Sequence, residues 1–150
     1  MKASMLTAAC AAMLALTACA TGARLGDAEK LALYRSHAGA PVDNFSYFGR
    51  INGWTPLGDS ALVVWTKPSE AWLLELAGPC PELQYTPAIC LTSNMGRVYA
   101  RFDQVQVRGM VGGPNMPCHI ASIRPLDLKA VRASEKELRE ASVQERAAGS

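Results

Sequence analysis

Apolar residues recur at helical spacing near the two ends of the chain and at strand-like spacing between them. Residues 27–38 are predicted to form a helix, because Leu31 and Tyr34 fall on one face. Asp27 is a suitable N-cap, and Gly39 is suited to close the far end. A first amphipathic helix is therefore expected where the globular part of the chain begins.

A second helix is predicted over residues 128–140, with Asp127 as its cap. Leu128, Val131 and Leu138 form a narrow apolar stripe along it. This stripe predicts a helix that packs on the rest of the domain mainly through its first turns.

The far end of this helix offers less to hold it in place. Glu135 and Arg139 have the spacing of a favourable ion pair on a helix surface. The apolar stripe is too thin to fix the last residues of the chain, so we expect residues 142–150 to fray.

The clearest β-hairpin joins residues 61–66 to residues 71–76 through a turn of four residues. The first run is almost continuously apolar, as expected for a strand that is covered on both faces. Trp72, Leu74 and Leu76 alternate with their neighbours and would share one face of the second strand.

Further strands, and a single helical turn, are predicted from shorter apolar runs bounded by Gly, Pro and Asn. The strands are residues 45–54, 89–92, 98–107 and 118–123, the helical turn is residues 81–84, and Asn94-Met95-Gly96 is a turn. The alternation changes phase near Asp103, and again between Ile120 and Ile123. Such changes indicate bulges or crossings between packing layers. We therefore expect an α+β fold: a small curved antiparallel sheet or partly open barrel of about five to six strands, with an N-terminal and a C-terminal helix.

The first residues of the chain do not fit this domain. Lys2 is followed by an uncharged, mostly small apolar stretch, which is typical of a secretory signal peptide. The sequence Leu16-Thr17-Ala18-Cys19 resembles the lipobox of bacterial lipoproteins. That resemblance implies a signal peptide over residues 1–18, removed after a diacylglycerol is attached to Cys19, and acylation of the new amine. Ordinary cleavage and an uncut membrane helix are the alternatives.

The residue after the modified cysteine bears on location. In lipoproteins, Asp at this position retains the protein in the inner membrane, whereas this chain has Ala20. The resemblance thus implies the periplasmic face of the cell outer membrane, with the lipid as the membrane contact. Residues 19–26 would form a tether, residues 27–141 a single domain, and residues 142–150 a frayed tail.

Three cysteines remain after the leader and the lipid site: Cys80, Cys90 and Cys118. An oxidising compartment favours a disulfide, but three thiols cannot all pair within one chain. Cys80 and Cys118 lie beside prolines at junctions of loop and strand, so we favour their pairing, with Cys80–Cys90 as the second choice. Cys90 lies within an apolar run and is interpreted as a small buried hydrophobe.

Composition narrows the classes of function. Apolar residues make up 49% of the 150 residues and charged residues 19%, which favours a folded domain over a disordered chain. The formal charge is +2, and loss of Lys2 would lower it to +1. So small a charge gives no electrostatic footprint for a nucleic acid, and we expect no nucleic-acid partner.

The residues that carry chemistry are few and scattered. His37 and His119 lack the spacing of metal ligands, and no glycine-rich phosphate loop is present, so we expect neither a metal nor another cofactor. The Asp residues at strand edges are interpreted as turn caps and the Arg residues as solvated or ion-paired; they are Asp43, Asp59, Asp103, Arg50, Arg97, Arg101, Arg108 and Arg124. Trp54, Trp65 and Trp72 are interpreted as core residues, with a stacking platform for sugar as the alternative.

One resemblance covers residues 31–131. It is carried by the segments Phe48-Gly49-Arg50-Ile51, Trp54-Thr55-Pro56-Leu57-Gly58, Ala71-Trp72-Leu73-Leu74, Gly78-Pro79-Cys80, Leu91-Thr92-Ser93, Phe102-Asp103, Pro117-Cys118-His119-Ile120 and Ile123-Arg124-Pro125-Leu126-Asp127. Together these segments resemble a family of small proteobacterial envelope lipoproteins of unknown function. The two-cysteine pattern of this family supports the Cys80–Cys118 pairing, and Cys90 is not part of the pattern. The resemblance does not indicate an activity.

The sequence leaves two classes of function open. The first is an outer-membrane-anchored lipoprotein without catalytic activity, which binds an envelope protein or a small ligand or has a structural role. The second is an enzyme acting on cell-envelope material, with Asp103 and an arginine as candidates. A closed pocket holding a carboxylate of raised pKa would favour the enzyme, and an exposed apolar patch would favour partner binding.

Overall fold

The structure is a computed structural model that describes residues 25–108 and 116–149. The predicted signal peptide, Cys19 and residues 20–24 of the tether lie outside the described residues. The elements are α1 (Asp27–Ser36), β1 (Asn44–Ser46), β2 (Gly53–Pro56), β3 (Ala61–Lys67), β4 (Glu70–Leu76), η1 (Pro81–Gln84), β5 (Ile89–Leu91), β6 (Arg97–Tyr99), β7 (Gln104–Val107), β8 (Met116–Pro125) and α2 (Leu128–Ala148).

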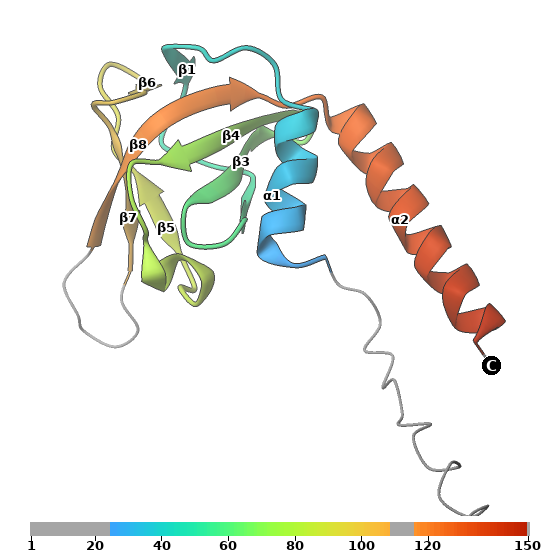
Figure 1. Cartoon of the computed structure of the whole chain (residues 1–150). Coiled ribbons are helices and arrows are strands. Elements are labelled where there is room, and N and C mark those ends of the chain that lie inside the picture. The colour runs from blue at the N-terminus through green and yellow to red at the C-terminus, as the bar shows by residue number, and fades with distance from the viewer. Residues whose placement is uncertain (1–24, 109–115, 150) are drawn as a thin grey trace, which may run out of the picture.

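The main sheet has six strands in the order β2-β3-β4-β8-β7-β5, and every neighbouring pair is antiparallel. It curls into a half-barrel, and β1 and β6 form a separate two-stranded sheet (Figure 1). The predicted α+β class, with a partly open barrel and a helix at each end, is confirmed.

The predicted central hairpin is confirmed as β3 and β4. Its register pairs Val64 with Trp72 and Leu62 with Leu74, and it shifts between Trp65 and Lys67. Most residues of both strands are buried, because one face of the hairpin points into the half-barrel and the two helices pack on the other face.

Two of the longer predicted strands are wrong, for a shared reason. The predicted strand 45–54 is divided between β1 and β2, which belong to different sheets, and Gly49 between them has a φ of +77°. The predicted strand 98–107 is divided between β6 and β7 at Arg101, whose φ is +70°. In both cases a left-handed residue turns the chain from one sheet to the other. The phase change near Asp103 marks this crossing between sheets.

The second phase change is a bulge, as predicted. Leu74 pairs with Ile123 and Leu76 pairs with Ile120, so β8 has one more residue between these pairs than β4 has. The extra residue lets Ile120 and Ile123 both be buried in the half-barrel, although they are three positions apart.

Helix α1 differs from its prediction at both ends. Gly26, not Asp27, is its N-cap, and the Gly26 N–H donates to the Glu29 carboxylate at 3.1 Å. The helix ends at Ser36, two residues before the predicted end, and the Gly39 N–H then donates to the carbonyl of Pro125. Gly39 therefore joins the segment after α1 to the end of β8 and does not cap the helix.

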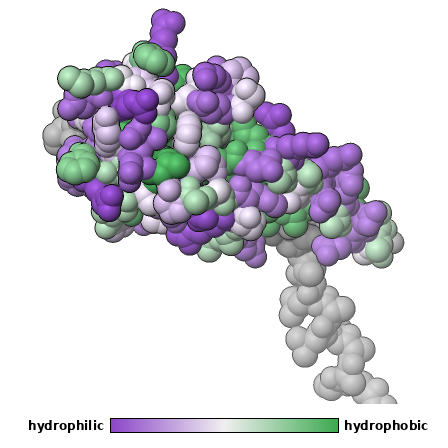
Figure 2. All heavy atoms as spheres, turned by 90° about the horizontal axis from the view of Figure 1, so that it is seen from above, coloured by the Kyte–Doolittle hydropathy of each residue, from purple (hydrophilic) through white to green (hydrophobic). Residues whose placement is uncertain are grey.

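Helix α2 is capped as predicted but is longer. The Asp127 carboxylate accepts hydrogen bonds from the N–H groups of Lys129 and Ala130, both at 3.1 Å. The helix continues to Ala148, beyond the predicted end at residue 140, and the face of it that Figure 2 shows is mostly hydrophilic. In place of the predicted Glu135–Arg139 ion pair, the Glu135 carboxylate accepts from the Tyr34 hydroxyl at 3.0 Å, and Arg139 Nε donates to the Glu135 backbone carbonyl at 3.3 Å.

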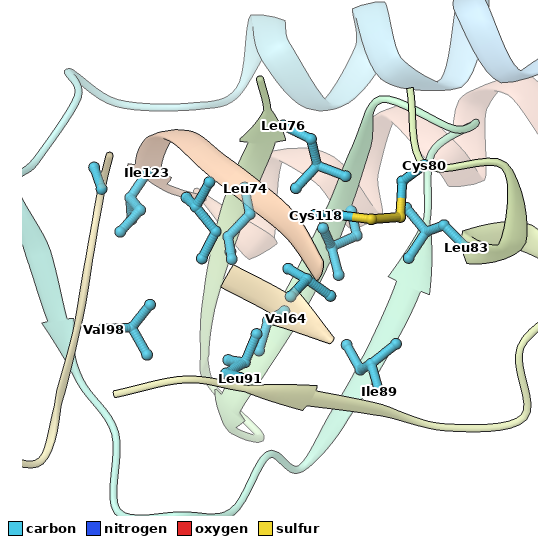
Figure 3. Packing of buried hydrophobic residues seen from close by; sticks show 14 of the residues in the cluster. Val64, Leu74, Leu76, Cys80, Leu83, Ile89, Leu91, Val98, Cys118 and Ile123 are labelled. Carbon is cyan, nitrogen blue, oxygen red and sulfur yellow. A yellow bond between two sulfur atoms is a disulfide. The ribbon is translucent and has the colours of Figure 1, made fainter. Parts of the chain in front are cut away.

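The core consists of two layers separated by the sheet. The larger layer fills the half-barrel and is closed on one side by Phe45 and Val98 from the small sheet, and Figure 3 shows its side chains converging on one another. The smaller layer holds Leu31, Tyr34 and Val131 of the two helices against the outer face of β3 and β4. The sheet is thus held between a barrel interior and a pair of helices.

Cys80 and Cys118 form a disulfide, which confirms the favoured pairing. Both are buried, and their Cα atoms are 6.0 Å apart (Figure 3). The bond joins the segment before η1 to β8 inside the larger core layer. Cys90 is free and exposed, so its interpretation as a buried hydrophobe is wrong: it points outward between Ile89 and Leu91, which are buried.

Candidate functional site

Asp103 is the carboxylate that the sequence suggests for catalysis. In the structure, its side chain stabilises a turn through hydrogen bonds. Its side chain is buried and accepts hydrogen bonds from the Thr92 hydroxyl and from the Tyr99 N–H, each at 2.7 Å. The Thr92 hydroxyl in turn accepts from the Gln104 N–H at 2.8 Å. Each carboxylate oxygen thus has a donor from the protein, and together they hold the crossing from β6 to β7.

The other acidic candidates also lie at turns. Asp43 is exposed, and its carboxylate lies 3.7 Å from the guanidinium of Arg101. Asp59 is exposed, and its backbone carbonyl accepts from the Cys80 N–H at 2.7 Å. Neither residue shares a hydrogen-bond partner with the Asp103 side chain, so the three carboxylates do not form one bonded cluster.

The arginines are engaged separately. Arg124 donates to the backbone carbonyls of Gly39 and Ala38, at 2.8 and 3.3 Å. Arg97 donates to the Asn44 side chain at 2.5 Å. These contacts hold the segment after α1 against β8, and β1 against β6.

The two histidines do not form a metal centre. His37 Nε2 lies 2.9 Å from the Ser134 hydroxyl and helps to join α1 to α2. His119 is exposed and lies 3.5 Å from the Gln104 amide. Within residues 25–108 and 116–149, no three or more His, Cys, Asp or Glu side chains are grouped as metal ligands.

The three tryptophans are half-buried and pack against the core, as predicted. Trp72 stacks on Phe45, with ring centroids 5.2 Å apart, and donates to the Thr66 hydroxyl at 3.3 Å. Trp54 packs against the larger core layer and Trp65 against the smaller one. All three therefore serve packing.

Three groups have shifted pKa values, and each shift has a structural cause. Burial raises the pKa of Tyr34, and its hydrogen bond to Glu135 raises it further. Burial also raises the pKa of Tyr47, with a further contribution from the charge of Cys90. The hydrogen bond from Thr66 lowers the pKa of Glu70, aided by Lys67.

The feature that packing does not explain is a pair of exposed apolar side chains beside the small sheet. Phe48 is 87% exposed and Met95 is 97% exposed. Phe48 lies beside the turn that carries Met95: a Cβ built on Gly96 would be 3.7 Å from the Phe48 ring, and the Tyr47 N–H donates to the Gly96 carbonyl at 2.7 Å. We call Phe48 and Met95 the apolar tip.

The backbone at this tip is unusual. Asn94 and Arg97 exchange two backbone hydrogen bonds, and Met95 and Gly96 between them have φ values of +50° and +73°. A two-residue turn with positive φ at both positions favours Asn, Asp or Gly at the first position. Met95 therefore occupies a conformation that costs an ordinary residue about 1 kcal/mol, while its side chain gains almost no burial.

Two exposed arginines are close to the tip in sequence. Arg50 follows Phe48 by two residues, and Arg97 follows Met95 by two. Figure 2 shows pale green, apolar groups projecting among purple, hydrophilic ones at the end of the molecule remote from α2. Another exposed aromatic residue, Phe102, lies beyond the other end of β6 and is 80% exposed.

A second feature is an open groove of about 670 Å³ between the start of α1 and the distal half of α2. Leu25, Leu138 and Ala141 supply its apolar lining, and the remaining lining is charged or polar. Among the described residues, no helix is both long enough and apolar enough to cross a bilayer.

Sequence reasoning missed the tip and the groove. The sequence predicts a turn at Asn94-Met95-Gly96, and in this turn Met stands where Asn or Gly would be favoured. That mismatch between residue and turn type is the signal that points to the tip.

The fold defines a disulfide-linked α+β half-barrel domain with one helix at each end. The chain belongs to a family described as "Family of unknown function (DUF6491)", whose model matches residues 1–142. Comparisons with curated proteins and with solved structures found no significant match.

Proposed function

We propose that this protein is a lipoprotein of the outer membrane, anchored through Cys19 at the periplasmic face, and that it binds another envelope protein through the apolar tip. It acts as a binding module without catalytic activity. The lipobox-like sequence before Cys19 supports the anchor. The Cys80–Cys118 disulfide supports an oxidising compartment.

The exposure and backbone conformation of Met95 are the main evidence for a binding role. An exposed Met in a left-handed turn contributes little to the core and adds backbone strain, so folding alone does not account for it. Phe, Met and Arg are enriched at protein interfaces, and the tip and its neighbours combine all three. The partner chemistry that fits is an apolar pocket rimmed by carboxylates, which would receive Phe48 and Met95 and pair with Arg50 and Arg97.

The position of the tip, far from the proposed anchor, also suits binding of such a partner. Figure 1 shows β1 and β6 at the end opposite to the C-terminus of α2 and to the start of α1. The segment that leads to Cys19 enters at α1. The anchor would therefore hold one end of the domain near the membrane and leave the tip free to meet a protein.

Site-specific photocrosslinking in living cells tests this proposal. A photoreactive residue placed at position 48 or at position 95 should give a discrete adduct with one envelope protein. The same residue at position 85 is the control, because Tyr85 is an exposed aromatic residue beyond η1 and outside the tip. Absence of an adduct from both tip positions, or an equal adduct from position 85, would contradict the proposal.

The variant Met95→Asn separates binding from folding. Asn suits a left-handed turn position, so the variant should be more stable than the native chain by about 0.5–1 kcal/mol. It should bind the crosslinked partner at least about tenfold more weakly, since a central interface side chain commonly contributes more than about 1.4 kcal/mol. A Met95→Asn chain that binds with unchanged affinity would remove the tip from the interface.

A further inference from the structure

The distal half of α2 extends beyond the part that packs on the domain. Leu128 and Val131 contribute to the smaller core layer, and the side-chain hydrogen bonds from α2 to α1 come from Ser134 and Glu135. Beyond them, Leu138 is 41% exposed and Val143 is 58% exposed. A helical segment this short is marginal in water on its own, so core packing does not explain why α2 continues to its last residue.

One face of α2 is basic along most of its length. Positions 132, 136, 139, 143 and 146 are separated by four, three, four and three residues, so they lie along a single face. They hold Arg132, Lys136, Arg139, Val143 and Arg146, all exposed, and we call them the basic stripe.

The acidic residues of α2 lie beside the stripe or away from it. Glu140 flanks it and is 3.7 Å from Lys136. Glu135 bonds to Tyr34, and both Glu135 and Glu145 line the groove towards α1, which Arg139 of the stripe also lines. Glu137 is displaced from the stripe around the helix. The stripe itself contains four cations, no acid and one exposed apolar residue.

The stripe lies close to the point where the chain enters from Cys19. The groove is lined both by Leu25 and Asp27 at the start of α1 and by Arg139 and Ser142 of α2. Cys19 precedes Leu25 by six residues, so the chain allows a separation of at most about 20 Å. Figure 1 shows that α1 begins at the same end of the molecule at which α2 ends.

We propose that the basic stripe of α2 rests on the phospholipid leaflet that holds the lipid of Cys19, where its cations bind anionic headgroups and Val143 enters the interface. This proposal rests on the lipid anchor of the proposed function. The anchor makes the contact intramolecular in effect, so weak headgroup attraction suffices to orient the domain. Lys and Arg near an anionic surface each favour binding by roughly fivefold.

Such an orientation connects the two surfaces of the molecule. With α2 against the leaflet, the small sheet lies at the far end of the domain and presents the apolar tip to the periplasm (Figure 1). A freely tumbling domain on the same tether would present the tip in all directions. The stripe therefore acts as an orienting contact, separate from the protein-binding tip.

The test uses the processed, lipidated protein in phosphatidylcholine vesicles with and without phosphatidylglycerol. A nitroxide is placed by Val143→Cys in a chain that also carries Cys90→Ser, so that the label has one free thiol to modify. Gln144→Cys in the same background is the matched control, since it lies at nearly the same height on a different face of the helix. The measurement is the frequency at which the label collides with oxygen, compared with the frequency at which it collides with a water-soluble nickel chelate.

With phosphatidylglycerol present, the label at 143 should be shielded from the chelate and exposed to oxygen, while the label at 144 stays accessible to the chelate. The triple variant Arg132→Gln, Lys136→Gln and Arg139→Gln should lower the equilibrium constant for docking by about a hundredfold and restore chelate access at 143. Added salt should have the same effect as the triple variant, in the same direction. Because these side chains are exposed, the variant should keep its fold, which circular dichroism checks.

Equal chelate access at 143 with and without phosphatidylglycerol would overturn the proposal. Flotation of the protein with pure phosphatidylcholine vesicles reports the lipid on Cys19 independently of the stripe. A chain that floats but keeps position 143 in water contradicts the stripe alone. A chain that does not float contradicts the anchor, and with it the proposed function.

Discussion

Asp103 shows how a single buried carboxylate can be mistaken for a catalytic group. Its oxygens accept from Thr92 and Tyr99 at the point where the chain passes between sheets. Asp103→Ala should lower the free energy of unfolding by about 3 kcal/mol, because both donors lose a charged acceptor in a buried turn. Urea denaturation measures this, with Asp43→Ala as an exposed control that should change stability by less than about 0.5 kcal/mol. Equal effects of the two changes would contradict the structural role of Asp103.

Glu70 makes the stability of the fold depend on pH. The hydrogen bond from the Thr66 hydroxyl, at 2.5 Å, lowers the pKa of Glu70 below its ordinary value of 4.5. A lowered carboxyl pKa stabilises the fold above the unfolded pKa, and this stability is lost as pH falls through the folded pKa. We expect part of the acid sensitivity below about pH 4.5 to come from this turn.

The check is a carboxyl titration by NMR in the native chain and in two variants. Thr66→Val should return the Glu70 pKa towards its ordinary value, whereas Thr66→Ser, which keeps the hydroxyl, should preserve the shift. If Thr66→Val left the titration of Glu70 unchanged, the hydroxyl would not be the cause.

At the scale of elements, α2 combines a packed beginning with an exposed continuation. Val131 is 3% exposed and belongs to the smaller core layer, whereas Val143 is 58% exposed. Val131→Ala should cost about 2 kcal/mol through lost burial and the cavity left behind. Val143→Ala should stay within about 0.5 kcal/mol in thermal or chemical denaturation. A comparable loss at both positions would mean that the distal half of α2 is also packed in solution.

The same scale shows what the sequence can and cannot predict. The β3–β4 hairpin was predictable, because two apolar runs of matching length flank a short polar turn. The bulge in β8 was predictable from the spacing of Ile120 and Ile123. The division of the predicted strands 45–54 and 98–107 was not, because β-favouring residues continue through Gly49 and Arg101 and only tertiary contacts decide which sheet they join.

The candidate surfaces were harder to predict than the fold. Neighbouring apolar residues in a sequence do not show which ones the core will cover, so Phe48 and Met95 resemble ordinary strand and turn residues. Cys90 illustrates the same limit, because its apolar neighbours are buried while it points outward on the edge strand β5. Burial of a short segment depends on its partner strand, which alternation alone does not identify.

At the scale of the whole molecule, the disulfide links segments that lie 38 residues apart. Replacing both cysteines by Cys80→Ala and Cys118→Ala should lower the free energy of unfolding by about 3–4 kcal/mol, because the unfolded chain regains the freedom that the closed loop removes. Guanidinium denaturation of the oxidised chain and of the double variant measures the difference. Cys90→Ala is the control, since that thiol is exposed and free, and an equally large loss from it would contradict this account.

The two proposed surfaces lie at opposite ends of the whole molecule. The basic stripe and the start of α1 would face the membrane, and the apolar tip would face the periplasm at the opposite end. Both assignments depend on export and on a lipid at Cys19. The disulfide is compatible with export, and the anchor is the step on which the orientation of the domain rests.

Intact-mass and peptide mass spectrometry of the protein from its native membrane tests the proposed lipid anchor. We expect a chain that begins at Cys19, carries a diacylglycerol thioether and an acylated amine, and retains the Cys80–Cys118 disulfide. A native chain that keeps Met1, or one in which Cys19 bears no lipid, would contradict it.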